Sequence, residues 1–239
     1  MAKTLLSEAY PSADNWRTLV EQFSPEAIAH KLLLSHVPFV FREEPLKFAL
    51  FRHTIAEAFD IEPTNVFIVG SAMSGRSLKG SDIDKNYSTD SDIDTLLVSE
   101  RLFTNYVMKS LEWLRDVTLP KFEKGKRPLS PHITADTTKY IGWLSSSACK
   151  GIWRPDSLPN DAEARIEFFG KFNHVSLKTL GLQLSDDTVS KVNGRVARSF
   201  ADAVTDLSSS IAKLRREFRN EEVTPAPEDA IDLMPSAAS

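Results

Sequence analysis

Two short apolar runs rich in β-branched residues constrain the fold most, because both have the length and composition of buried strands. The first is VFIVG, residues 66–70, which ends at a glycine. The second is the apolar part of SDIDTLLVS, residues 91–99. Continuous apolar runs of this length are typical of strands covered on both faces. Because helical patterns surround them, the sequence predicts an α/β protein with a small mixed sheet flanked by helices.

The helical patterns begin well before the first run. Residues 15–60 contain two of them, one of which opens with Ser24 as a helix N-cap and Pro25 at the first helical position. Residues 71–90 are small and polar and predict a loop with a short helix at its start. Further helices are predicted in residues 100–119, 136–151, the first half of 162–182 and 201–222, with a turn-rich connection in 152–161 and an edge strand in 190–200.

These patterns divide the chain into three parts. We predict an N-terminal helical region over residues 1–64 and a core that includes the C-terminal helix over residues 65–222. Residues 223–239 contain three prolines and no apolar periodicity, and they predict a disordered tail.

Composition narrows the class of protein. The chain of 239 residues is 41% hydrophobic and 26% charged, which is typical of a soluble globular protein. A single cysteine, Cys149, excludes a disulfide within the chain and favours the cytoplasm. No apolar run approaches the roughly 20 residues that cross a bilayer, so no membrane association is expected. The net charge of −4 argues against a broad basic surface for nucleic acid.

A repeated tetrapeptide carries the candidate metal ligands. Ser-Asp-Ile-Asp occurs at residues 81–84 and again at 91–94. In a strand, Asp92 and Asp94 project from one face with Cα atoms about 6.6 Å apart, while Ile93 points into the core. Two carboxylates so arranged can bind Mg²⁺ or Mn²⁺. The second copy continues into an apolar strand that holds it rigidly, whereas the first is followed by polar residues and predicts a solvated loop.

A glycine and a serine at the end of the first predicted strand favour a phosphate group. Gly70 lets a ligand approach the backbone closely, and Ser71 offers a hydroxyl at the start of a predicted helix. Arg76 in the following loop can reach a triphosphate, or it can be an ordinary surface arginine. A phosphate site at the end of one strand and a carboxylate pair at the start of another are together typical of a site that binds a nucleoside triphosphate with its Mg²⁺.

At these residues the chain resembles the DNA polymerase β superfamily of nucleotidyltransferases, whose hallmark is hG[GS]…Dh[DE]h. It is most similar to small bacterial nucleotidyltransferase-domain proteins that carry VGSA, a long loop and then DSDID, a pattern found here within residues 69–98. The resemblance implies the polymerase β-like fold. It also implies transfer of a nucleoside monophosphate from an NTP, foremost ATP, to an acceptor hydroxyl, with release of pyrophosphate.

The resemblance also implies roles for individual residues. Asp92 and Asp94 would bind two Mg²⁺, Gly70 and Ser71 would hold the β- and γ-phosphates, and Ser91 would support the carboxylates. The acceptor would be a protein side chain, an RNA end or another nucleotide. A toxin–antitoxin or phage-defence setting, with a partner protein from the same operon, follows by analogy at family level alone.

Two features leave alternatives open. Ten residues separate Ser71 from Asp82, a spacing found in minimal nucleotidyltransferases, so spacing alone favours the first copy of the tetrapeptide; we give the strand argument more weight. The superfamily also supplies a third carboxylate from a neighbouring strand, and the predicted strand 190–200 has none. The substitutes are Asp136, Asp156 and Glu167, of which we favour Asp156, while Arg195 and Arg198 suit phosphate.

The missing third carboxylate motivates a second hypothesis, a non-catalytic nucleotide-binding subunit of a larger complex. A third hypothesis is the modification of a small molecule, which requires a closed pocket beside the site.

Overall fold

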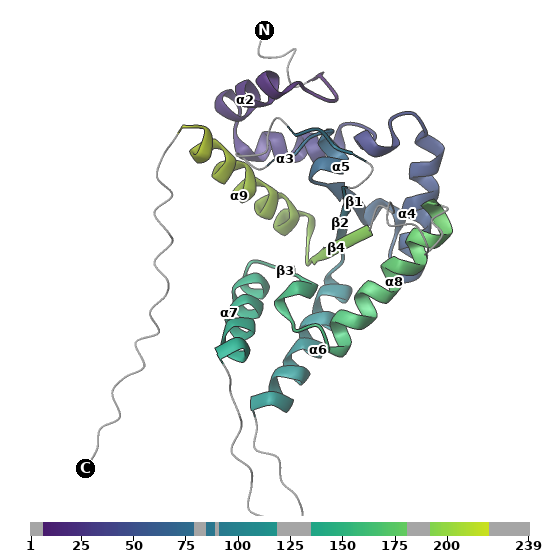
Figure 1. The fold of residues 1–239 in the computed structure, drawn as a ribbon, viewed down its shortest axis with the longest axis vertical. Helices are drawn as coiled ribbons and strands as arrows, with labels where there is room; N and C mark the ends of the chain where they lie inside the picture. The colour runs from purple at the N-terminus through teal and green to yellow at the C-terminus, as the bar shows by residue number, and fades with distance from the viewer. Residues whose placement is uncertain (1–6, 79–84, 89–90, 119–134, 181–191, 220–239) are drawn as a thin grey trace, which may run out of the picture.

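A computed structural model describes residues 7–78, 85–88, 91–118, 135–180 and 192–219 (Figure 1). The strands are β1 (Val66–Val69), β2 (Ile93–Val98), β3 (Ile152–Trp153) and β4 (Val192–Ala197). The helices are α2 (Ala13–Gln22), α3 (Pro25–Leu34), α4 (Pro45–Phe59), α5 (Ser71–Ser74), α6 (Glu100–Thr118), α7 (Ala135–Cys149), α8 (Glu163–Leu180) and α9 (Phe200–Phe218). The predicted α/β class with a small mixed sheet is confirmed.

The four strands form one sheet in the order β1-β2-β4-β3. β1 is antiparallel to β2, β2 is parallel to β4, and β3 is antiparallel to β4. In this register Asp94 lies opposite Val69 of β1 on one side and opposite Asn193 of β4 on the other. The end of β1 and the beginnings of β2 and β4 therefore meet at the same end of the sheet.

The prediction that residues 190–200 form an edge strand is wrong, because β4 has neighbours on both sides. β3 pairs only with the end of β4, where Ile152 lies opposite Ala197 and Trp153 opposite Val196. A strand of two residues is too short to produce a periodic pattern, and Pro155 follows it closely, so the sequence around it indicates only turns. α8 also runs over all of Glu163–Leu180, beyond the half that was predicted.

Aromatic packing explains the length of α8. Phe168 and Phe172 of this helix pack on Phe59 of α4, with ring centroids 5.2 and 4.9 Å from that ring. The helix lies close against the sheet at Gly194, where an added Cβ would be 2.6 Å from the ring of Phe172 and 2.4 Å from Oγ1 of Thr95. Tertiary contacts of this kind override the weaker local helical signal.

The opposite face of the sheet is covered by α9 and α3. Figure 1 shows α9 on one side of the strands and α4 and α8 on the other. Phe200, the first residue of α9, packs on Phe67 of β1 with ring centroids 5.9 Å apart. Near its other end, Nε of Arg215 donates a hydrogen bond of 2.5 Å to the carbonyl oxygen of Val20 in α2. The N-terminal helices are thus joined directly to the last helix.

The division of the chain into residues 1–64 and 65–222 stays a prediction, and the tail over residues 223–239 lies outside the described residues. In the described ranges, no helix has the length and apolar character needed to cross a membrane.

Candidate functional site

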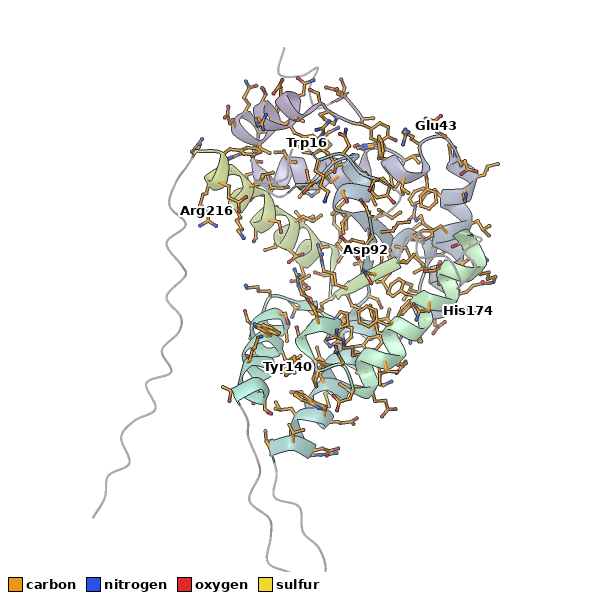
Figure 2. The ribbon with its side chains drawn as sticks, in the orientation of Figure 1. Trp16, Glu43, Asp92, Tyr140, His174 and Arg216 are labelled. Carbon is orange, nitrogen blue, oxygen red and sulfur yellow. The ribbon has the colours of Figure 1, made fainter. Side chains whose placement is uncertain are left out.

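The beginning of β2 presents two carboxylates on either side of a buried isoleucine. Asp92 and Asp94 are exposed, whereas Ile93 is 1% exposed. Asp92 lies near the middle of the molecule in Figure 2, and its Oδ2 accepts a hydrogen bond of 2.8 Å from Nδ2 of Asn193 on β4. The alternation predicted for this copy of the tetrapeptide is confirmed. The first copy, residues 81–84, lies outside the described residues.

Gly70 brings the end of β1 against the carboxylate pair. Its φ of +68° lies in the left-handed region that favours glycine. A Cβ added there would lie 3.2 Å from Oδ2 of Asp94, tighter than an ordinary contact. The structure therefore brings together the two motifs that the sequence singled out, because β1 and β2 are antiparallel and Val69 lies opposite Asp94.

A cavity of about 390 Å³ opens between these motifs and α9. Four residues expected to bind nucleotide or metal line it, namely Gly70, Ser71, Ser91 and Asp94. Two cations, Lys85 and Arg195, also line it, and so does Ser210 of α9. Because α5 has only four residues, its dipole contributes little, and the cations are the main positive charges beside the cavity.

Arg76, expected to reach a triphosphate, lies in a different environment. Its Nε donates a hydrogen bond of 3.2 Å to the carbonyl oxygen of Pro11, and its backbone forms a bridge with Asn86. Arg76 thus joins the loop after α5 to the N-terminal segment. The sequence analysis missed Lys85, which follows the first tetrapeptide and had no motif to identify it.

Asp156, favoured as the third carboxylate, is exposed in a short 3₁₀ turn, Pro155–Ser157. It lines a second cavity, of about 270 Å³, together with Asp94 and Asn193. Within the described ranges, no group of three or more His, Cys, Asp or Glu side chains is arranged to hold a metal ion. A catalytic role for Asp156 stays a prediction.

Glu167 and Asp136 are the other two candidates for the third carboxylate. Glu167 of α8 forms ion pairs with Lys109 and with Lys171, the latter at 3.5 Å. Although partial burial raises the pKa of Glu167, the hydrogen bond and charge of Lys109 and the charge of Lys171 leave it below its ordinary value. The side chain of Asp136 lies outside the described residues.

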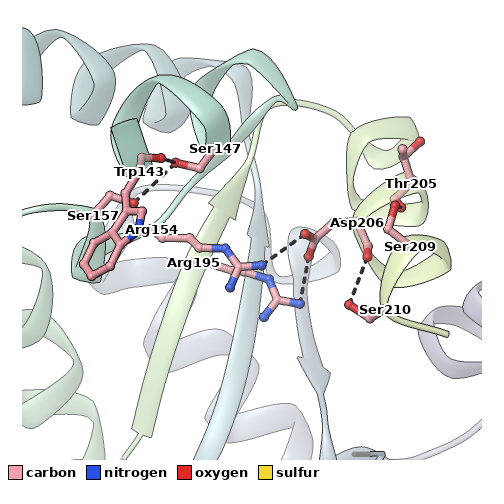
Figure 3. Close-up of polar contacts among 9 residues, drawn as sticks. All are labelled: Trp143, Ser147, Arg154, Ser157, Arg195, Thr205, Asp206, Ser209 and Ser210. Carbon is pink, nitrogen blue, oxygen red and sulfur yellow. Dashed lines mark hydrogen bonds and ion pairs between the residues drawn. The ribbon is translucent and has the colours of Figure 1, made fainter. Parts of the chain in front are cut away.

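Arg195 of β4 stands on the same face of the sheet as Asp94, since Asn193, two residues before it, lies opposite Asp94. Its Nη2 is 3.0 Å from Oδ2 of Asp206, whose Oδ1 is 3.1 Å from Nη2 of Arg154 (Figure 3). The side chain of Arg195 is 19% exposed and that of Asp206 13% exposed. The carboxylate of Asp206 on α9 therefore binds two guanidinium groups, one from β4 and one from the residue that follows β3.

Electrostatics connect Arg195 to the carboxylate pair. Burial lowers the pKa of its guanidinium most strongly, Asp206 raises it, Arg154 lowers it and Asp94 raises it again. An arginine side chain nevertheless stays protonated in proteins. A fixed positive charge thus faces Asp94 from the strand on which a third carboxylate was expected.

Asp206 could have been found in the sequence. It lies three residues after Ala203 and next to Leu207, both of which belong to the apolar stripe of the last helix. A carboxylate that becomes buried beside the apolar stripe of an amphipathic helix needs a cationic partner. The sequence does not say that the partners are Arg195 and Arg154.

The carboxylates of Asp92 and Asp94 provide part of a binding site for a divalent cation. Two exposed carboxylates on one face at the rigid beginning of a strand offer the oxygen ligands that Mg²⁺ and Mn²⁺ prefer. Gly70, Ser71, Lys85 and Arg195 beside them offer backbone access, a hydroxyl and positive charge, which suits a polyphosphate.

Comparisons of the chain with protein-family models, with curated proteins and with solved structures found no match.

Proposed function

We propose that the chain is a Mg²⁺- or Mn²⁺-dependent nucleotidyltransferase with a polymerase β-like fold. It would transfer a nucleoside monophosphate from an NTP, foremost ATP, to an acceptor hydroxyl. The observation that supports this most is the contact between Gly70 and Asp94, because it combines a backbone that a phosphate can approach with a carboxylate pair. The mixed sheet, with both motifs at one end, supports the same proposal.

The reaction forms one P–O bond and breaks another. The acceptor oxygen attacks the α-phosphorus of the NTP, the bond to the bridging oxygen of pyrophosphate breaks, and the acceptor proton passes to a base or to water. Asp92 and Asp94 would hold the cation, which when bound activates the acceptor oxygen and offsets charge on the leaving group.

The chain's own residues would position the triphosphate. Gly70 admits the phosphates to the backbone, and the hydroxyl of Ser71 donates to them. Lys85 and Arg195, which line the same cavity, offset the negative charge that develops on pyrophosphate as it leaves. Asp206 holds Arg195 in place for this role.

The absence of a three-acid group from the described residues favours a second candidate, a nucleotide-binding subunit without catalytic activity. Such a subunit would use the same phosphate cavity but would need a partner protein for its function. A cytoplasmic setting beside a partner from the same operon suits either candidate.

Label transfer tests the proposal. The purified protein is incubated with Mg²⁺ or Mn²⁺ and each α-labelled NTP in turn, with total RNA and cell lysate as acceptor pools. Asp92→Ala/Asp94→Ala is compared with Asp82→Ala/Asp84→Ala. We expect transfer to be lost in the first double variant only; loss in the second variant only would assign the metal to the other copy. NTP binding without any transfer would favour the non-catalytic subunit.

A further inference from the structure

A cavity runs along the free edge of β1, away from the carboxylate pair. In the described part of the sheet β1 pairs only with β2, so its other edge has no neighbouring strand. A cavity of about 340 Å³ lies there, and Val66, Phe67 and Ile68 all line it. Because successive side chains of a strand point to opposite faces, a cavity that touches three consecutive residues lies along the strand's edge. We call it the β1 groove.

The backbone of Ile68 directs its polar groups into this groove. Ser99, which follows β2, donates its backbone N–H to the carbonyl oxygen of Ala197 in β4. Because successive residues of a strand bond toward opposite edges, Leu96, three residues earlier, faces β1 and bonds with Phe67, which lies opposite it. Ile68 therefore directs its N–H and C=O away from β2. Among the described residues, no group hydrogen bonds with them there, and such an unpaired edge is a template for another strand.

Two walls of different character flank the β1 groove. On one side, the end of α3 and the segment after it contribute Leu33, Leu34 and Val37, and Leu34 is 63% exposed. On the other side, α4 contributes Phe48 and Arg52. α3 packs with α9 on one face of the sheet and α4 lies on the other (Figure 1). A strand added to β1 would therefore direct alternate side chains toward the apolar wall and toward Arg52.

Arg52 has no carboxylate partner among the described residues. Its Nε donates a hydrogen bond of 2.7 Å to the carbonyl oxygen of Pro63, and its guanidinium carbon lies 5.5 Å from the centroid of the Phe48 ring. Burial lowers the pKa of this guanidinium, and no acid in the described part of the chain raises it again. A partly buried cation without a counter-ion is unfavourable, so a carboxylate brought by a ligand would be bound there.

We infer that the β1 groove binds an extended peptide segment of a partner protein, in which an acidic residue stands between two apolar residues. The segment pairs with the backbone of Ile68 as an added strand. Its carboxylate accepts hydrogen bonds from Arg52, and its two apolar side chains pack on Leu34 and Val37. This interaction lies outside the proposed nucleotidyl transfer and does not depend on it.

A small apolar acid fits the groove less well than a peptide. Its carboxylate would pair with Arg52 and its hydrocarbon part would cover Leu34, but the N–H and C=O of Ile68 would stay unpaired. A peptide offers both an acceptor and a donor at the spacing of a neighbouring strand. The unpaired backbone of Ile68, beside a cation without a counter-ion, therefore favours an acidic peptide.

Binding of labelled peptides tests the inference on the full chain. The probe is a fluorescein-labelled heptapeptide with a valine–aspartate–valine centre flanked by threonines, and its anisotropy is followed as protein is added. We expect asparagine in place of the central aspartate to weaken binding about tenfold, because a charge-assisted hydrogen bond is lost. Arg52→Gln should weaken binding of the aspartate peptide by a similar factor and abolish the difference between the two peptides. Arg115→Gln, at a side chain of α6 that is 60% exposed, is the matched control and should change neither.

Strand pairing has two readouts of its own, neither of which needs a protein variant. N-methylation of one alternate set of peptide amides should abolish binding, whereas methylation of the other set should be tolerated, because only one edge of the peptide faces β1. In the wild-type chain, saturating peptide should slow hydrogen exchange of the Ile68 amide at least about tenfold, measured by nuclear magnetic resonance.

Several results would overturn the inference. They are a wild-type chain that does not bind the aspartate peptide, equal affinity for the aspartate and asparagine peptides, and unchanged exchange at Ile68. Binding of 4-methylpentanoate as tight as that of the peptide would assign the groove to small acids instead. Residues 231–233, Ile-Asp-Leu, have the same pattern as the probe. A probe that binds only to the Asp232→Asn chain would assign the groove to this segment and overturn the partner protein.

Discussion

Gly70 and Asp94 are in contact across two antiparallel strands, and a Cβ on Gly70 would lie 3.2 Å from Oδ2 of Asp94. The two residues come from motifs 24 positions apart in the sequence. Their contact makes the end of β1 part of the carboxylate site, and it gives this glycine two functions. It adopts a φ of +68° that other residues rarely adopt, and it leaves space beside the carboxylate.

Gly70→Ala should impair both folding and ligand binding. We expect the free energy of unfolding to fall by about 1–2 kcal/mol, because an L side chain is strained at positive φ. NTP affinity should fall at least about tenfold, because the methyl group crowds Asp94 and the phosphate approach. Urea unfolding and NTP titration measure the two effects. Gly170→Ala on α8, where an added Cβ meets nothing within 4 Å, is the control, and equal losses in both variants would contradict the role of Gly70.

Asp94→Asn should remove metal affinity while preserving the fold. The side chain is exposed and the amide has the same shape, so the free energy of unfolding should change by less than about 0.5 kcal/mol. Mn²⁺ binding, followed by electron paramagnetic resonance in the presence of NTP, should weaken at least about tenfold because an anionic ligand is lost.

Asp156→Asn is the informative companion of this variant. Asp156 shares a cavity with Asp94 but belongs to no three-acid group among the described residues, so Mn²⁺ affinity should change little. A loss as large as that of Asp94→Asn would make Asp156 a metal ligand after all.

Asp206→Ala should destabilise the protein strongly. It leaves Arg195, which is 19% exposed, without its carboxylate and beside Arg154, and an unpaired buried charge costs about 3–5 kcal/mol. Arg195→Met in the same chain should restore most of the free energy of unfolding, since the uncompensated charge is removed. Urea denaturation of the single and double variants gives the coupling energy. No recovery in the double variant would mean that Asp206 stabilises the fold by other contacts.

Stability should also fall between pH 6.5 and pH 4 because of His36. Burial, with a smaller effect from the charge of Lys31, lowers the pKa of this histidine from 6.5 to about 4. Within that range the unfolded chain binds a proton that the folded chain does not, so the free energy of unfolding decreases as the pH is lowered. The full shift corresponds to about 3 kcal/mol, which screening of a half-buried group reduces to about 1–2 kcal/mol.

Urea unfolding at several pH values checks this effect. His36→Gln should have a shallower pH dependence than the wild type across pH 4–6.5. His53→Gln, at a side chain that is 59% exposed, should retain the wild-type dependence. Identical profiles in all three proteins would show that the pKa of His36 is the same in the folded and the unfolded chain.

Features that depend on consecutive residues could be predicted from the sequence. The β-branched runs predicted β1 and β2, and the alternation around Ile93 correctly placed Asp92 and Asp94 on the exposed side. These features follow from the two-residue repeat of a strand, which every residue obeys wherever the strand lies in the sheet. Neighbouring strands were harder to predict, and β3 was missed because two residues carry no period.

By itself, the sequence determined the type and approximate position of most helices and strands, and the face of β2 on which the carboxylates lie. Only the tertiary structure decided that β4 lies between β2 and β3, and that Asp206 of α9 joins Arg195 to Arg154. Only the tertiary structure shows that Arg76 binds the carbonyl oxygen of Pro11 and that Lys85 lines the candidate phosphate cavity. The physical reason is that side-chain periodicity is local, whereas strand order and ion pairing depend on contacts between residues far apart in the chain, which no local pattern encodes.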